Sequence, residues 1–196
     1  MLSYKDSLNV LKKTRALLEG HFVLSSGLHS NKYIQCAKLL SFPSQALKIC
    51  NSLSKKIVKA FPFVDLILSP AIGGIIIGYE IGRQLNIETI FSERVGGKFK
   101  LRRGFSIKKS AKVLIMEDVI TTGKSSLECL KLVKKAKGKV LGFACIIDRS
   151  DKKNLLIKKN KIISQVKISV PVYKKNKLPT FLHKIPISTP GSRFLK

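Results

Sequence analysis

Two adjacent carboxylates and a group of small hydroxyl residues lie near the middle of the 196-residue chain. Glu117 and Asp118 follow four apolar residues at 113–116, which predict a short buried strand that ends just before them. Residues 121–126 read Thr-Thr-Gly-Lys-Ser-Ser and predict a turn that leads into a helix. The free N–H groups of such a turn and the helix dipole both favour an anion. This stretch therefore predicts a phosphate site.

The acidic pair indicates which kind of phosphate compound binds at this site. Carboxylates repel a bare polyphosphate, but they accept hydrogen bonds from the 2′- and 3′-hydroxyls of a ribose. We therefore expect Glu117 and Asp118 to hold a ribose whose 5′-phosphate is bound by residues 121–125. The alternatives are an ordinary acidic strand end and a nucleotide-binding P-loop ending at Gly123-Lys124-Ser125. Asp118 stands where the P-loop needs its first glycine, which disfavours that motif.

The flanking segments follow the strand–turn–helix–strand order of an open parallel sheet. We expect strands at 64–69, 87–92, 113–116, 140–147 and 162–170, and helices at 3–19, 43–59, 74–85 and 125–137. In the helix at 43–59 we expect Leu47, Cys50, Ile57 and Val58 to face inward. Residues 20–35 predict a hairpin outside the main sheet, and prolines punctuate an irregular tail after residue 170. The expected fold class is α/β, as a single domain over 1–196 with a mainly parallel sheet flanked by helices. A small hood lobe would comprise about residues 1–40 and the tail.

Further polar groups follow neighbouring strands of this sheet. The turn 69–74 and the pair Asp148-Arg149 both come directly after predicted strands, and open α/β sheets bind ligands at that edge. The guanidinium of Arg149 suits a carboxylate because its fork binds both oxygens, although a lone arginine is more often a surface residue. Residues 94–104 are basic and glycine-containing, which indicates either a solvated hairpin or a mobile lid over an anionic site.

The composition indicates which classes of binding partner to expect. The formal net charge is +27, but the lysines are spread along the chain with few aromatics among them, which favours anionic small substrates over nucleic acid. The longest apolar stretch, 71–79, is too short to cross a bilayer, and charged residues interrupt 1–20, which disfavours a signal peptide. The four cysteines lack metal-like or disulfide-like spacing. We expect a cytoplasmic protein with no specific nucleic-acid partner and no membrane partner.

The segment 117–125 resembles the phosphoribosyl-pyrophosphate signature of type I phosphoribosyltransferases. The segments 20–30, 69–74, 101–105, 148–150 and 190–193 resemble, together and in order, the orotate phosphoribosyltransferase family, over nearly the whole chain. The resemblance implies the type I phosphoribosyltransferase fold and a Mg²⁺-dependent pentosyl transfer. Its substrates would be phosphoribosyl pyrophosphate and orotate, and its products orotidine 5′-monophosphate and pyrophosphate, in de novo pyrimidine biosynthesis. It also implies a homodimer in which a mobile loop, here about 94–104, closes over the neighbouring site.

Site residues carried over from the resemblance form three groups. Phosphoribosyl pyrophosphate would contact Glu117, Asp118, Val119, Ile120, Thr121, Thr122, Gly123, Lys124 and Ser125, and its pyrophosphate the turn Ala71, Ile72 and Gly73. Orotate would contact Thr121, Arg149, Tyr33 and Ile34. The catalytic groups would be Asp118 and the lid cations Arg94 and Lys98, which stabilise and protonate the leaving pyrophosphate. Mg²⁺ would be carried by the pyrophosphate, with no direct side-chain ligand.

This chain departs from the family pattern at several positions. Lys124 stands where the family usually has a small residue, and Ser25 and Gly73 stand where many members have lysines. The lid is also shorter than usual and lacks a Lys/His-rich sequence. Two other functions stay open: a purine phosphoribosyltransferase, which 20–30 and 190–193 disfavour, and a phosphoribosyl-pyrophosphate-sensing regulator that binds nucleic acid. The regulator is disfavoured because the chain has no room for an added DNA-binding segment.

Overall fold

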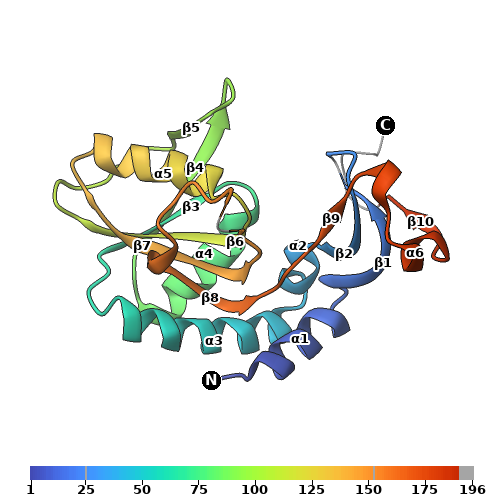
Figure 1. The fold of residues 1–196 in the computed structure, drawn as a ribbon. Coiled ribbons are helices and arrows are strands. Elements are labelled where there is room, and N and C mark those ends of the chain that lie inside the picture. The colour runs from blue at the N-terminus through green and yellow to red at the C-terminus, as the bar shows by residue number, and fades with distance from the viewer. Residues whose placement is uncertain (25, 152, 190–196) are drawn as a thin grey trace.

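The structure is a computed structural model that describes residues 1–24, 26–151 and 153–189. Its main sheet has six strands in the order β5-β4-β3-β6-β7-β8, and all neighbours are parallel except β4 and β5 (Figure 1). The strands are β3 Leu66–Pro70, β4 Thr89–Val95, β5 Lys98–Leu101, β6 Lys112–Ile120, β7 Lys139–Asp148 and β8 Ile162–Lys167. The expected open, mainly parallel α/β sheet is confirmed.

Helices cover both faces of this sheet. The helices α3 (Pro43–Ala60) and α4 (Gly73–Leu85) lie on one face, and α5 (Lys124–Lys135) lies on the other (Figure 1). Side chains alternate along each strand, so Leu114 packs in the core on the α3 and α4 side while Val113 and Ile115 pack in the core on the α5 side. Burial on both faces explains why the central strands are almost continuously apolar.

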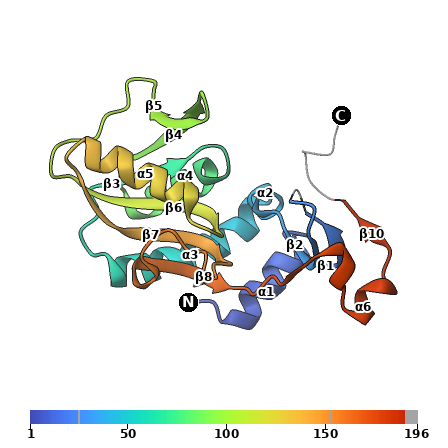
Figure 2. The ribbon, with the colours of Figure 1, turned by 45° about the horizontal axis from the view of Figure 1, so that its top comes forward.

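A second sheet forms the hood. Its four strands have the order β10-β1-β2-β9, with β1 Leu17–Val23 and β2 His29–Ile34 as the expected antiparallel hairpin. The tail supplies both outer strands, β9 Val172–Tyr173 and β10 Ile187–Ser188. Figure 2 shows the hood beside the main sheet, with the chain crossing from β8 to β9. The remaining elements are α1 Tyr4–Lys13, α2 Cys36–Leu40, η1 Lys159–Lys161, η2 Lys175–Lys177 and α6 Thr180–His183.

Several expected boundaries are wrong. The first helix begins as expected, where the Ser3 hydroxyl accepts the N–H of Asp6, but it ends at Lys13 instead of reaching residue 19. Leu18 therefore belongs to β1. Of the residues expected to face inward from α3, Leu47 and Val58 are 39% and 50% exposed. The tail is also more regular than expected, because it completes the hood sheet on both sides.

Two segments used in the family resemblance fall partly outside the described residues. Ser25 and residues 190–193 lie there, so the structure does not describe them. Among the helices of the described part, none combines the length and apolar character that crossing a membrane requires.

Candidate active site

The two carboxylates lie within β6, which is longer than the sequence predicted. The pairing of β3 with β6 stops at Leu68 and Ile115, whereas the pairing of β7 with β6 continues to Ile120 and Asp148. The end of β6 thus extends past β3 at the carboxyl edge of the sheet. Because β7 supplies hydrogen-bond partners beyond Met116, the strand continues through the acidic pair, and the expected end at residue 116 is wrong.

Adjacent residues of a strand face opposite sides of the sheet, and the two carboxylates follow this rule. Glu117 faces α5, where its carboxylate accepts a hydrogen bond from the Ser126 hydroxyl. Asp118 faces α4, where a Cβ atom on Gly73 would lie 2.8 Å from both of its carboxylate oxygens. The two carboxylates therefore lie on opposite faces of the sheet, next to each other at its carboxyl edge.

Burial dominates the electrostatics of both acids. Glu117 is 8% exposed, and desolvation raises the pKa of its carboxyl to about 7, with a further increase from the charge of Asp118. Hydrogen bonds from the hydroxyl and backbone of Ser126 act in the opposite direction. Desolvation also raises the pKa of Asp118, against the hydrogen bond that its Oδ1 accepts from the Val119 N–H at 2.8 Å.

The phosphate loop follows β6 directly and leads into α5. Gly123 has a φ of 71°, and a Cβ atom there would lie 2.8 Å from Cγ1 of Ile157, so both backbone and packing require glycine. The helix begins at Lys124, one residue earlier than expected. A cavity of about 140 Å³ is lined by Glu117 and residues 119–125. Since a water occupies about 30 Å³ of the liquid, this cavity has room for a phosphate group.

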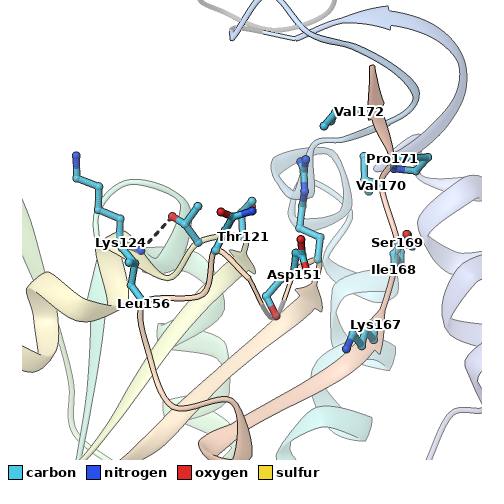
Figure 3. A pocket seen from close by; sticks show the side chains of 14 residues that line it. Thr121, Lys124, Asp151, Leu156, Lys167, Ile168, Ser169, Val170, Pro171 and Val172 are labelled. Carbon is cyan, nitrogen blue, oxygen red and sulfur yellow. Dashed lines mark hydrogen bonds between the residues drawn. The ribbon is translucent and has the colours of Figure 1, made fainter. Parts of the chain in front are cut away.

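A larger cavity of about 800 Å³ shares three of its lining residues, Thr121, Thr122 and Lys124, with the first cavity. Figure 3 shows Thr121 and Lys124 on one wall and Ser169 to Val172 on the opposite wall. Arg149, which follows β7, also lines this cavity. Its Nε is buried and has no hydrogen-bond partner among the described residues, and burial lowers the pKa of its guanidinium. An unpaired buried donor facing a cavity is suited to an anionic ligand.

The residues that form the far wall of this cavity were not predicted from the sequence. The wall comes from residues 167–172, which link β8 to the hood (Figure 3). Residues 151, 154 and 156 also line the cavity, and the Leu156 N–H donates to the Thr122 carbonyl at 2.9 Å, on the side of the phosphate loop. The one sequence signal of the far wall is Pro171, which ends the predicted strand and turns the chain toward the hood. The expected orotate contacts Tyr33 and Ile34 lie half-buried on β2 and are not among the residues that line the cavity.

The expected pyrophosphate turn lies beside the acidic pair. It joins β3 to α4, contains a cis peptide between Ala71 and Ile72, and is tied to β4 by the Ala71 N–H, which donates to the Ser92 carbonyl at 2.8 Å. Ile72 is 85% exposed. Through the close approach of Gly73 to Asp118, the structure brings together the two segments assigned to phosphoribosyl pyrophosphate.

The predicted lid is a hairpin built from the end of β4 and β5. The guanidinium of Arg94 is already engaged: it pairs with the Glu128 carboxylate of α5 at 3.2 Å and lies 4.1 Å from the centre of the Phe99 ring. Lys98 is exposed at the hairpin and forms no ion pair with any described residue. Of the two cations assigned to the lid, Lys98 is therefore the one available to a ligand.

We searched the described ranges for side chains that could bind a metal ion together. Among those residues, no group of three or more His, Cys, Asp or Glu side chains could hold a metal ion.

Comparison with known proteins agrees with this geometry. The phosphoribosyl transferase domain family matches residues 43–176. An orotate phosphoribosyltransferase from Phenylobacterium zucineum is 44% identical over 195 residues, covering 100% of both chains. The orotate phosphoribosyltransferase structure from Aeropyrum pernix matches with a TM-score of 0.69 at 22% identity, covering 82% of this chain and 92% of that one.

An adenine phosphoribosyltransferase structure from Thermoanaerobacter pseudethanolicus also shares the fold. Its TM-score is 0.60 at 18% identity, and the match covers 70% of this chain and 88% of that one. Likeness at this level of identity shows the fold alone, so the assignment rests on the full-length relative. That relative and the matched domain show that the chain belongs to the orotate phosphoribosyltransferase family.

Proposed function

We propose that this protein transfers the 5-phosphoribosyl group of phosphoribosyl pyrophosphate to orotate and releases pyrophosphate and orotidine 5′-monophosphate. The observation that carries the proposal is a pair of neighbouring cavities at the end of β6 that share the lining residues Thr121, Thr122 and Lys124. One is bounded by a carboxylate and the phosphate loop, and the other contains the unpaired guanidinium of Arg149. A phosphorylated sugar and a carboxylate-bearing base match these two halves. The reaction belongs to de novo pyrimidine biosynthesis.

The donor substrate is proposed to bind through the loop and the acidic pair. The 5′-phosphate lies at the loop 121–125, where the first turn of α5 offers free backbone N–H groups. The ribose hydroxyls donate to Glu117 and Asp118, and the pyrophosphate lies against residues 71–73. Lys124 lines both cavities and adds a cation that compensates in part for the lysine absent at Gly73.

The chemistry proposed needs charge stabilisation and no protein nucleophile. The bond from the anomeric carbon to the pyrophosphate oxygen breaks, and the sugar gains oxocarbenium character. Pyrophosphate leaves with the bonding electron pair, and a ring nitrogen of orotate forms the new bond to that carbon while its proton passes to water. The buried carboxylate of Asp118 stabilises the positive sugar, and Lys98 stabilises the leaving pyrophosphate when the hairpin closes over the site.

Mg²⁺ is proposed as the metal that accompanies the substrate. When bound to the pyrophosphate, it neutralises the negative charge that develops on the leaving group. Asp118 and the turn 71–73 then bind the loaded substrate through its sugar and its phosphate oxygens.

Orotate is favoured over a purine by the Arg149 guanidinium. Orotate carries a carboxylate, whereas adenine and hypoxanthine carry none. A site in which the Nε of a guanidinium has no hydrogen-bond partner among the described residues gains a charge-assisted pair only with the carboxylate-bearing base. Thr121, on the wall shared with the phosphate loop, is proposed as the second contact to the base.

A homodimer is proposed on the α3 and α4 side of the molecule. Leu47, Ile76 and Tyr79 are 39%, 55% and 65% exposed, and they line a groove of about 330 Å³. Clustered exposed apolar side chains are typical of an interface. The same helix α4 starts at the pyrophosphate turn, so a partner seated there would lie close to the site. We propose a cytoplasmic location as well, which the four buried free cysteines support.

Loss of orotate absorbance on addition of phosphoribosyl pyrophosphate and Mg²⁺ tests the function. The expected result is rapid loss that depends on all three components, with stoichiometric pyrophosphate release. Duplex DNA binding is measured in parallel, because the basic charge suggests the sensing regulator as the competing function. Absence of turnover together with tight, salt-sensitive DNA binding would refute the enzyme and favour the regulator.

A further inference from the structure

The hydroxyl of Ser126 is the polar group on an otherwise apolar face of α5. Ser126, Cys129 and Val133 are the buried residues of this helix, and all three are essentially inaccessible to water. Their spacing of three and four residues places them on one face. A buried hydroxyl on such a face is costly unless it is paired. Its partner is the carboxylate of Glu117 on β6, to which it donates a hydrogen bond.

The same serine also acts on Glu117 through its backbone. Ser126 is the third residue of α5, where a helix has N–H groups without intrahelical partners. The backbone of Ser126 lowers the pKa of the Glu117 carboxyl, as its hydroxyl does. One residue therefore favours the charged form of a carboxylate that borders the phosphate-loop cavity.

We propose that Ser126 is a positioning residue that favours the ionised form of the Glu117 carboxylate and orients it toward the ribose site. This inference rests on the proposed phosphoribosyl transfer. A ribose hydroxyl donates best to an ionised carboxylate, because a protonated one offers a competing O–H. Without the serine hydroxyl, the buried Glu117 loses one of the groups that favour its charge.

The surroundings of Glu117 otherwise oppose ionisation. The neighbouring charge on β6 is Asp118, which raises the pKa of Glu117. The thiol of Cys129 faces it from α5 and the thiol of Cys145 from β7, and burial raises the pKa of both thiols, so they stay neutral. The hydroxyl and the backbone of Ser126 favour the charged form of Glu117 against these effects. With a pKa of about 7, Glu117 changes charge within the neutral range, so the loss of one hydrogen bond affects function there.

Ser126→Ala should raise the pKa of Glu117 by about one unit, since a hydrogen bond to a charged group is worth roughly one to two pKa units. The acidic limb of kcat/KM for phosphoribosyl pyrophosphate should move up in pH by the same amount. We expect about a five-fold loss at pH 7 that shrinks to less than about two-fold at pH 9. Ser126→Thr restores a hydroxyl and should recover most of the loss at pH 7.

The pKa itself is measured on the full-length protein by following the ¹³C signal of the Glu117 carboxyl, assigned with Glu117→Gln. Ser54→Ala is the matched control, because it removes a buried hydroxyl that bonds to Gln84 far from the loop, and it should shift neither the signal nor the limb. If Ser126→Ala does not fold, Ser126→Cys keeps the volume with a weaker donor and should give a smaller shift in the same direction.

Two results would overturn the inference. One is an unchanged Glu117 pKa in the Ser126 variants. The other is a loss of activity that is equal at every pH and follows the loss of thermal stability, which would make the serine merely structural. Failure of the proposed function looks different: the wild-type protein would not consume orotate at any pH, while the carboxyl signal would still report whether Ser126 controls the charge of Glu117.

Discussion

Gly73 and Asp118 lie so close that a Cβ atom on Gly73 would sit 2.8 Å from both carboxylate oxygens of Asp118. The first residue belongs to the turn assigned to pyrophosphate and the second to the acidic pair assigned to the ribose. This contact makes the two segments one site. It also accounts for glycine at this position, because a side chain here would displace the Asp118 carboxylate from its present place.

Gly73→Ala should therefore lower activity more than stability. The Asp118 side chain can rotate away from the added methyl group, so the fold survives, but its carboxylate then leaves the ribose site. We expect about a ten-fold or larger loss of kcat/KM for phosphoribosyl pyrophosphate, with a change in unfolding free energy of about 1 kcal/mol or less. Steady-state kinetics and denaturant unfolding check this. Unchanged kinetics would show that Asp118 does not need its present position.

Arg149→Met should lower the activity toward orotate while it maintains or raises the stability of the fold. The guanidinium is partly buried, and its Nε has no hydrogen-bond partner in the part of the chain that the structure describes, so an apolar side chain of similar length removes an unfavourable group. We expect Tm to stay equal or rise by a few degrees, while kcat/KM for orotate falls about 100-fold or more. Arg149→Lys, which keeps the charge without the fork, should be intermediate. Retained orotate turnover in Arg149→Met would remove the carboxylate-binding role.

Gly123→Ala should destabilise the protein for two separable reasons. The φ of 71° disfavours alanine, and its Cβ would lie 2.8 Å from Cγ1 of Ile157. We expect a loss of about 2–4 kcal/mol in unfolding free energy. Gly27→Ala is the control, because Gly27 has a φ of 76° but open space around it, and it should lose only about 1–2 kcal/mol. The double variant with Ile157→Ala tests the steric part. Equal losses for the two glycine variants would argue against the clash.

Glu117→Gln should stabilise the protein increasingly as pH rises. The pKa of Glu117 is raised from 4.5 to about 7 in the folded state, so the folded protein binds this proton more tightly than the unfolded chain does. Its favourable contribution is full below about pH 4.5 and is lost as pH rises through about 7. Glutamine resembles the protonated form and avoids that loss.

The expected gain for Glu117→Gln in unfolding free energy is on the order of 2–3 kcal/mol at pH 8.5 and near zero at pH 4.5. Urea unfolding at both values measures it. A gain that does not depend on pH would show that burial does not suppress the charge of Glu117.

The sequence was informative wherever local rules decide the structure. The strand–turn–helix order, the hairpin of the hood and the turn that leads into α5 depend on neighbouring residues, and the structure confirms them. It was less informative where distant segments decide. The length of β6 depends on pairing with β7 up to Asp148, and no pattern within 113–120 reveals this partner.

The cavity wall opposite the phosphate loop could not be predicted either, because it also depends on contacts between distant segments. Residues 167–172 reach it only because the tail crosses from the main sheet to the hood and pairs there with β2. The apolar pattern of 162–170 indicates a strand but not its route. The engagement of Arg94 with Glu128 was likewise hidden, since the two residues lie on separate elements and meet only in the folded chain.

Arg149, with Thr121 as the second contact, is proposed to select orotate as the acceptor. The most direct measurement offers orotate, adenine and hypoxanthine together at equal concentrations, with phosphoribosyl pyrophosphate and Mg²⁺, and identifies the nucleotides formed. Orotidine 5′-monophosphate should be formed at least about 1,000-fold faster than either purine nucleotide, because only orotate pairs with the guanidinium. Purine nucleotides as the main products would contradict the account.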